Sequence, residues 1–203
     1  MSNRSGVSVL VTVSEHDESF EETLLSLVKQ TFHKWEIIIG IYRCGISSTL
    51  EKEVKTLVDK YQKNGLNIRV IVYGMDLKYE VLNSMVCDAT YDYISVVDVG
   101  DVWESDKLEH QFPLLEKYDV VGTKCQHYGD TVGFPNIPNG ELSHVNFLMR
   151  NPVCNSSVIL HKRDAFWEEC EEINQYPMWI RLHSLNRNFY NINKVLCKER
   201  KKT

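Results

Sequence analysis

Two aspartates and a glycine follow a run of strand-forming residues and could hold a cation or the hydroxyl groups of a ligand. The run Tyr93 to Val97 is followed at once by Asp98, Gly100 and Asp101, and then by a polar, helix-like segment. Hard divalent cations prefer carboxylate oxygens as ligands. Aspartate also commonly closes a turn by hydrogen-bonding nearby backbone. The motif therefore predicts either a ligand site or a capped turn at the end of this strand.

The residues before this motif alternate between expected strands and amphipathic helices. Strands are expected at residues 7–13, 35–41, 68–73 and 93–97, and helices in the intervals between them. Such alternation is typical of a mostly parallel sheet with right-handed crossovers. Ligands of these sheets bind outside the carboxyl ends of the strands. Asp98 therefore lies at an edge where a ligand is expected.

The second half of the chain is less regular. The expected elements are a helix interrupted by Pro113, short strands at 120–121, 156–160 and 189–196, and a helix near 178–185. Residues 127–152 are rich in Gly, Pro and Asn, which indicates either a binding or lid loop or a surface excursion. The charged residues 198–202 are expected to form a solvated tail.

Composition excludes several functional classes. The chain has 203 residues, 25% of them charged, with a net charge of −5, which argues against a general nucleic-acid binder. No apolar run approaches the length of about 18 residues that a membrane span needs, so a cytoplasmic protein without a signal peptide is expected. Six cysteines without CxxC spacing predict buried thiols in a reducing compartment rather than a disulfide framework or a zinc site.

A series of short motifs resembles the family-2 glycosyltransferases over nearly the whole chain. In chain order they are Val7 to Ile39 with its ETL, S and QTF residues, Lys78 with Leu82-Asn83, Val97 to Trp103 followed by Lys107-Leu108-Glu109, Asn155 to Ile159, and Trp179 to Leu182. The resemblance implies the GT-A fold, a Rossmann-like α/β three-layer sandwich whose mostly parallel central sheet has helices on both faces. It also implies one domain, with residues 1–101 as the nucleotide-binding half and 102–203 as the acceptor-side half.

The resemblance further implies transfer of a sugar from a nucleotide-diphosphate donor to a carbohydrate or lipid-linked acceptor, assisted by manganese or magnesium. The residues implied for the donor are Thr12, Val13, Ser14, Glu15, Tyr42, Arg43, Lys78, Asn83 and Asp98. We expect Tyr42 to stack on the base or ribose and Arg43 to meet a phosphate. Asp101 is expected to hold the metal more than Asp98, which is left for the ribose hydroxyls.

Three positions depart from the family pattern. Tyr42-Arg43 stand where the family often has acids, Gly100 replaces the acid most associated with the metal, and Gln175 occupies the position of the catalytic base. Glutamine does not accept a proton at neutral pH. If the enzyme is active, Glu172 is the nearest replacement base and His183 a second candidate. The alternative is a degenerate domain that binds a nucleotide, a glycan or a protein.

Overall fold

The first half of the chain alternates strands with helices, as its sequence predicts. The computed structural model describes residues 4–43, 48–62, 66–169 and 175–202. The elements of this half are β1 (Val7–Val13), α1 (Phe20–Val28), β2 (Trp35–Ile41), α2 (Ser48–Gln62), β3 (Ile68–Val72), α3 (Lys78–Asp88) and β4 (Tyr93–Val97). Their strands are parallel in the order β3-β2-β1-β4. β1 and β2 are buried along their whole length because the sheet is covered on both faces.

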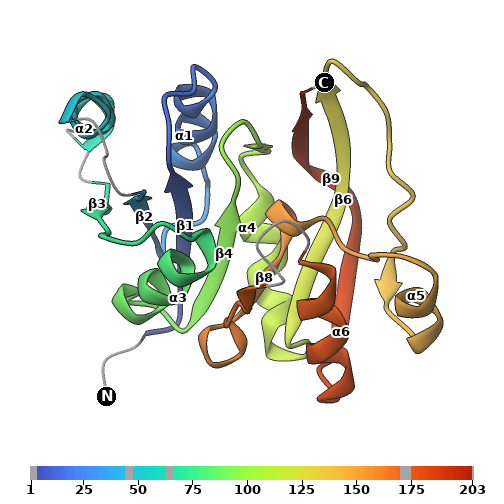
Figure 1. Cartoon of the computed structure of the whole chain (residues 1–203). Coiled ribbons are helices and arrows are strands. Elements are labelled where there is room, and N and C mark those ends of the chain that lie inside the picture. The colour runs from blue at the N-terminus through green and yellow to red at the C-terminus, as the bar shows by residue number, and fades with distance from the viewer. Residues whose placement is uncertain (1–3, 44–47, 63–65, 170–174, 203) are drawn as a thin grey trace.

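The second half continues the same sheet with strands of both directions (Figure 1). Its elements are β5 (Val102–Trp103), α4 (Lys107–Gln111), β6 (Val120–Gly129), β7 (Gly140–Glu141), α5 (His144–Met149), β8 (Ile159–His161), α6 (Tyr176–Ser184) and β9 (Phe189–Lys201), with 3-10 turns at Phe112–Glu116, Asn155–Ser157 and Lys162–Asp164. The sheet runs on as β4-β8-β6-β9-β5. The short strands β5, β7 and β8 pair antiparallel, whereas the long strands β6 and β9 pair in parallel. The predicted α/β fold with a mostly parallel sheet is confirmed.

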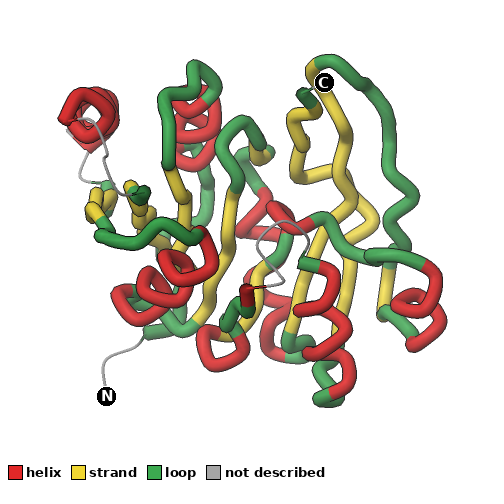
Figure 2. The backbone as a smooth tube through the Cα atoms, viewed as in Figure 1, coloured by secondary structure: helices red, strands yellow, loops and turns green. Residues whose placement is uncertain are grey.

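Helices cover both faces of this sheet and create two separate cores. Leu24 of α1, Val54 of α2 and Leu108 of α4 pack in one core. Leu82 of α3 and Trp179 of α6 pack in the other. Figure 2 shows the strands running between the helices. Among the described residues, none of the helices has the length and apolar character needed to cross a membrane.

The C-terminal residues differ from their predicted state. Residues 198–201 belong to β9, which pairs with β6 from Val120 opposite Phe189 to Gly129 opposite Lys201. The predicted solvated tail is therefore wrong, because strand pairing with a distant segment outweighs the charged local composition. The stretch 127–152 likewise contains β7, α5 and the end of β6, so it is not one continuous loop.

Candidate active site

The acidic turn at residues 98–101 follows the carboxyl end of β4, and its first aspartate faces outward. The side chain of Asp98 is 43% exposed, and its Oδ1 lies 2.5 Å from Nζ of Lys78 at the start of α3. Burial alone would lower the pKa of Lys78, but the adjacent Asp98 carboxylate raises that pKa above its ordinary value. The edge therefore carries a reachable carboxylate and a charged ammonium side by side.

The second aspartate of the turn faces inward. Asp101 is 7% exposed, and its Oδ1 accepts a hydrogen bond of 2.9 Å from the backbone N–H of Arg200. Burial raises the pKa of Asp101 to about 8, although the hydroxyl of Ser156 and the Arg200 N–H both hydrogen-bond the carboxyl group. Burial therefore favours the protonated form of Asp101, whereas Asp98 forms an ion pair with Lys78.

Gly100, between these acids, has a conformation that explains why no acid occupies its position. Its φ is +98°, in the region that glycine adopts without steric cost. Its N–H donates to Oγ1 of Thr23 at 2.8 Å, and its carbonyl accepts from the hydroxyl of Tyr128. A Cβ at this position would lie 3.2 Å from Cδ of Arg200 and from Oγ of Ser19. Glycine, rather than the acid of the family motif, therefore suits the backbone conformation at this position.

The sheet order β2-β1-β4 brings most of the predicted donor residues to the same edge as Asp98. These residues are Thr12 and Val13 at the end of β1, Ser14 and Glu15 just after it, Tyr42 and Arg43 just after β2, and Lys78 at the start of α3. The N–H of Tyr42 donates to the carbonyl of Val13 at 3.1 Å, which ties the two strand ends together. Val13 and Glu15 also line a cavity of about 180 Å³ beside α1 and α2.

Asn83, another of the predicted donor residues, hydrogen-bonds the protein backbone with both ends of its side-chain amide. Its Nδ2 donates to the carbonyl of Trp167 at 2.9 Å, and its Oδ1 accepts from the N–H of Trp167 at 2.9 Å. Both ends of the amide therefore bind one backbone unit. Asn83 anchors the segment that contains Trp167 against α3.

One of the two predicted catalytic positions, Gln175, is buried. Gln175 directly precedes α6, is 6% exposed, and accepts the N–H of Trp179 with its carbonyl at 3.3 Å. Glu172 lies outside the described residues.

His183 lies at the opposite edge of the sheet from Asp98. It lines a cavity of about 700 Å³ together with Tyr118 and Phe189, which adjoin the amino ends of β6 and β9. β4 and β6 both pair antiparallel with β8 and therefore run in the same direction, so these amino ends lie away from the carboxyl end of β4. The His183 ring also stacks on Phe147 at 4.3 Å. His183 therefore lies at the other end of these strands from Asp98.

Three residues that support the acidic turn were not predicted. Oγ of Ser156 accepts the N–H of Asp98 at 3.2 Å, and the carbonyl of Ser156 accepts Nε1 of Trp103 at 2.8 Å. The backbone N–H of Arg200 donates to Oδ1 of Asp101, and the hydroxyl of Tyr128 donates to the carbonyl of Gly100. The motif Asn155 to Ile159 could have pointed to Ser156, but the expectation of a solvated tail concealed Arg200.

Comparisons with known proteins give matches in both sequence and structure. The model of glycosyl transferase family 2 matches residues 8–167. An amylovoran biosynthesis glycosyltransferase, AmsB of Erwinia amylovora, is 24% identical over 208 residues, covering 94% of this chain and 68% of its own. An uncharacterized glycosyltransferase of Haemophilus influenzae is 23% identical over 204 residues, covering 93% of this chain and 73% of its own.

Two solved structures share the fold. The S. aureus TarS 1-349 structure with UDP superposes with a TM-score of 0.74 at 18% identity, covering 97% of this chain and 61% of that one. The mannosyltransferase PcManGT from Pyrobaculum calidifontis, in complex with GDP-Man and Mn²⁺, gives a TM-score of 0.73 at 14% identity, covering 98% of this chain and 57% of that one. The chain thus spans about three fifths of the length of these structures.

Proposed function

Because the chain belongs to glycosyl transferase family 2, as its sequence predicted, we propose that it transfers a sugar from a nucleotide-diphosphate donor. The donor binds at the carboxyl ends of β1, β2 and β4, and the acceptor is a carbohydrate or a lipid-linked sugar. The observation that carries this proposal is the Asp98–Lys78 ion pair at that edge. Lys78 offers charge to the diphosphate, and Asp98 accepts hydrogen bonds from ribose hydroxyls. The bound UDP of TarS and GDP-Man of PcManGT support a nucleotide donor.

The two aspartates suit a divalent cation unequally. The carboxylate of Asp98 is partly exposed and pairs with Lys78, so we assign it the first contact with manganese or magnesium. Asp101 is buried, and burial favours its protonated form, so we assign it the support of the turn. This assignment reverses the roles that the sequence suggested for the pair. A cation bound there would neutralise the departing diphosphate, and Lys78 already supplies part of that charge.

Transfer to an acceptor hydroxyl also needs a general base that takes its proton. The buried carboxamide of Gln175 cannot take the proton of an acceptor hydroxyl, so Glu172 is the candidate that the sequence leaves. A second function follows from the same observation. A domain with Gln175 at this position and Gly100 in the acidic motif would bind a nucleotide, a glycan or a protein partner without turnover.

A calorimetric titration with UDP and GDP, with and without Mn²⁺, tests the donor site. We expect Lys78→Met to weaken nucleotide binding about tenfold or more, because a charge-assisted hydrogen bond to phosphate is lost. Asp98→Asn should abolish any strengthening by Mn²⁺. Asp92→Asn, at the other end of the segment that forms β4, is the matched control and should bind like wild type. Absence of binding at millimolar nucleotide, or equal losses in all three variants, would contradict the proposed site.

A second assay separates the transferase from the binding module. Hydrolysis of UDP- and GDP-sugars is measured for wild type, Glu172→Gln and Gln175→Asp. Turnover by wild type that Glu172→Gln abolishes supports the transferase with Glu172 as its base. If wild type is inert and Gln175→Asp gains turnover, the domain is a degenerate transferase. If wild type is active and Glu172→Gln has no effect, the base is another residue.

A further inference from the structure

A group of thiols, a carboxylate and an imidazole gathers on one face of the β6–β9 pair. Cys125 of β6 lies opposite Cys197 of β9 in the strand register, and His127 lies opposite Glu199 two residues further along. Side chains two residues apart on a strand point to the same face. These two residue pairs therefore place two thiols, a histidine and a glutamate on the same face of the sheet.

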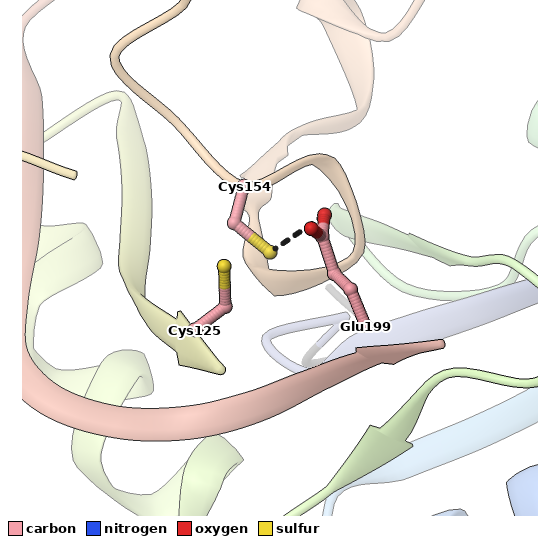
Figure 3. A group of neighbouring side chains, drawn as sticks. All are labelled: Cys125, Cys154 and Glu199. Carbon is pink, nitrogen blue, oxygen red and sulfur yellow. Dashed lines mark hydrogen bonds between the residues drawn. The ribbon is translucent and has the colours of Figure 1, made fainter. Parts of the chain in front are cut away.

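Cys154, on the segment just before the Asn155–Ser157 turn, completes this group from above the strands. The sulfur atoms of Cys125 and Cys154 and a carboxylate oxygen of Glu199 all lie within 4.8 Å of one another. Figure 3 shows the three side chains converging from three separate segments, with the hydrogen bond of 3.3 Å between Cys154 Sγ and Glu199 Oε1. Cys125 and Cys154 are 2% and 3% exposed, so the donor atoms are enclosed.

We propose that Cys125, Cys154 and Glu199 bind a zinc ion. Tetrahedral zinc with Zn–S distances of about 2.3 Å places its ligand atoms roughly 3.7 Å apart, a spacing that the present separations can reach. Thiolate donors select zinc over magnesium or manganese, which separates this site from the acidic turn. Cys197, fully buried and opposite Cys125 in the strand register, is a further thiol beside these three ligands.

The surroundings of Glu199 suit a metal ligand. Its Oε1 faces Cys154, whereas its Oε2 lies 3.1 Å from Nε2 of His127 and 3.2 Å from Nζ of Lys201. Partners on the outer oxygen fix the orientation of a ligating carboxylate. The scattered cysteine spacing hid this site in the sequence, because its ligands come from two strands and a separate loop.

A zinc ion at this position would also support the acidic turn. Cys154 lies two residues before Ser156, and Glu199 lies one residue before Arg200. Ser156 and Arg200 are the residues that hydrogen-bond Asp101. Binding would therefore tie together the two segments that enclose Asp101, and it should raise the melting temperature of the chain.

The test uses the reduced, chelator-treated full chain loaded with one equivalent of Zn²⁺ or Co²⁺. Retained zinc is measured by elemental analysis after gel filtration, and cobalt by its thiolate charge-transfer absorption. Wild type should retain about one zinc ion per chain and show the cobalt band. Cys125→Ser and Cys154→Ser should lose both signals, and Glu199→Gln should lower the affinity about tenfold or more. Cys87→Ser, at an exposed cysteine of α3, is the matched control and should behave like wild type.

Circular dichroism of each variant shows whether it is folded. If Cys154→Ser does not fold, the zinc retention of Cys125→Ser and Glu199→Gln decides the outcome. Zinc that wild type fails to retain, or that every variant retains equally, would overturn the proposal. A disulfide between Cys125 and Cys154 in protein purified without reductant, found by alkylation and peptide mapping, would instead assign the pair to redox chemistry and also overturn it.

Discussion

The two halves of the chain satisfy their buried polar groups differently. In the first half, the fully buried Glu36 accepts hydrogen bonds from Oγ of Ser8 at 2.7 Å, from the N–H of Thr90 at 2.6 Å and from Arg69 at 3.0 Å. In the second half, several buried polar atoms have no hydrogen bond. Among the described residues every such atom lies between residues 107 and 200, and examples are Lys107 Nζ, Gln111 Oε1, Trp167 Nε1 and Asn191 Oδ1.

The exposed apolar side chains follow the same division. Most of the large ones lie in the second half, including Phe134 at 71%, Leu148 at 68% and Met149 at 76% exposure. Departures from complete polar satisfaction and apolar burial are expected where a protein has functional sites. The buried carboxylate of Glu36 in the first half is therefore fully hydrogen-bonded within the sheet and its neighbouring segments. In the described part of the second half, buried polar atoms without hydrogen bonds occur together with most of the exposed large apolar side chains.

The largest expected effect comes from removing the buried carboxylate of Glu36. Glu36→Ala should lower the free energy of unfolding by about 3–5 kcal/mol, because it removes a buried charge and leaves Ser8, Thr90 and Arg69 without their acceptor. Urea denaturation followed by circular dichroism measures the change. Glu51→Ala, which removes an exposed pair with Lys55 on α2, is the control and should cost less than about 0.5 kcal/mol. Equal losses of unfolding free energy in the two variants would mean that the buried hydrogen bonds of Glu36 stabilise the fold no more than the exposed pair of Glu51.

The first half could be predicted from sequence because its signals are local. The helical period of α1, the continuous apolar runs of β1 and β2, and their alternation fix the elements and the edge at which Asp98 lies. The second half depends on pairings between distant segments. β9 is too charged to be recognised as a strand beyond residue 196, and its pairing with β6 determines where Glu199 and Arg200 lie.

The same limit applies to the site. The positions of Asp98 and Tyr42 at the strand ends, and of Lys78 at the start of α3, follow from topology and could be anticipated. The burial of Asp101 could not, because it results from Ser156 and Arg200, which approach from other parts of the chain. The left-handed conformation of Gly100 likewise depends on its contacts with Thr23 and Tyr128.

Gly100 lies where the two halves of the chain meet, and a side chain there should destabilise the fold by a smaller amount. Gly100→Ala should lower the free energy of unfolding by about 2 kcal/mol, because a Cβ is strained at positive φ. Gly100→Asp, which restores the family acid, should be destabilised at least as much and should gain no Mn²⁺-dependent nucleotide binding. Gly133→Ala, at a glycine with open space around its Cβ position, is the matched control. A stable Gly100→Asp variant whose nucleotide binding is strengthened more by Mn²⁺ would contradict this prediction. It would show that the turn accommodates the acid of the family motif.

The smallest expected effect concerns Lys107, whose amine is a buried unpaired group of the second half. Lys107 is 0% exposed, and its Nζ lies 3.6 Å from the centroid of the Trp103 ring without a hydrogen bond. Burial lowers the pKa of Lys107 to about 7. Lys107→Met should raise the free energy of unfolding by about 1 kcal/mol at pH 6.5, because the thioether keeps the packing against the ring and removes the cost of burying a charge.

The pH dependence of this gain distinguishes an unpaired amine from a packing change. Between pH 7 and the ordinary Lys pKa of 10.5, the unfolded chain holds a proton on Lys107 that the folded chain has released, so wild-type stability rises with pH. Below pH 7 both states are protonated and this contribution is flat. The advantage of Lys107→Met should therefore shrink and then reverse as the pH rises from 6.5 to 9, because the wild type gains about 1.4 kcal/mol per pH unit above pH 7. Urea denaturation in metal-free buffer measures the change, with Lys52→Met as the exposed control. An advantage that stays constant over this range would mean that Lys107 is neutral or well solvated, and that the second half is not strained at this position.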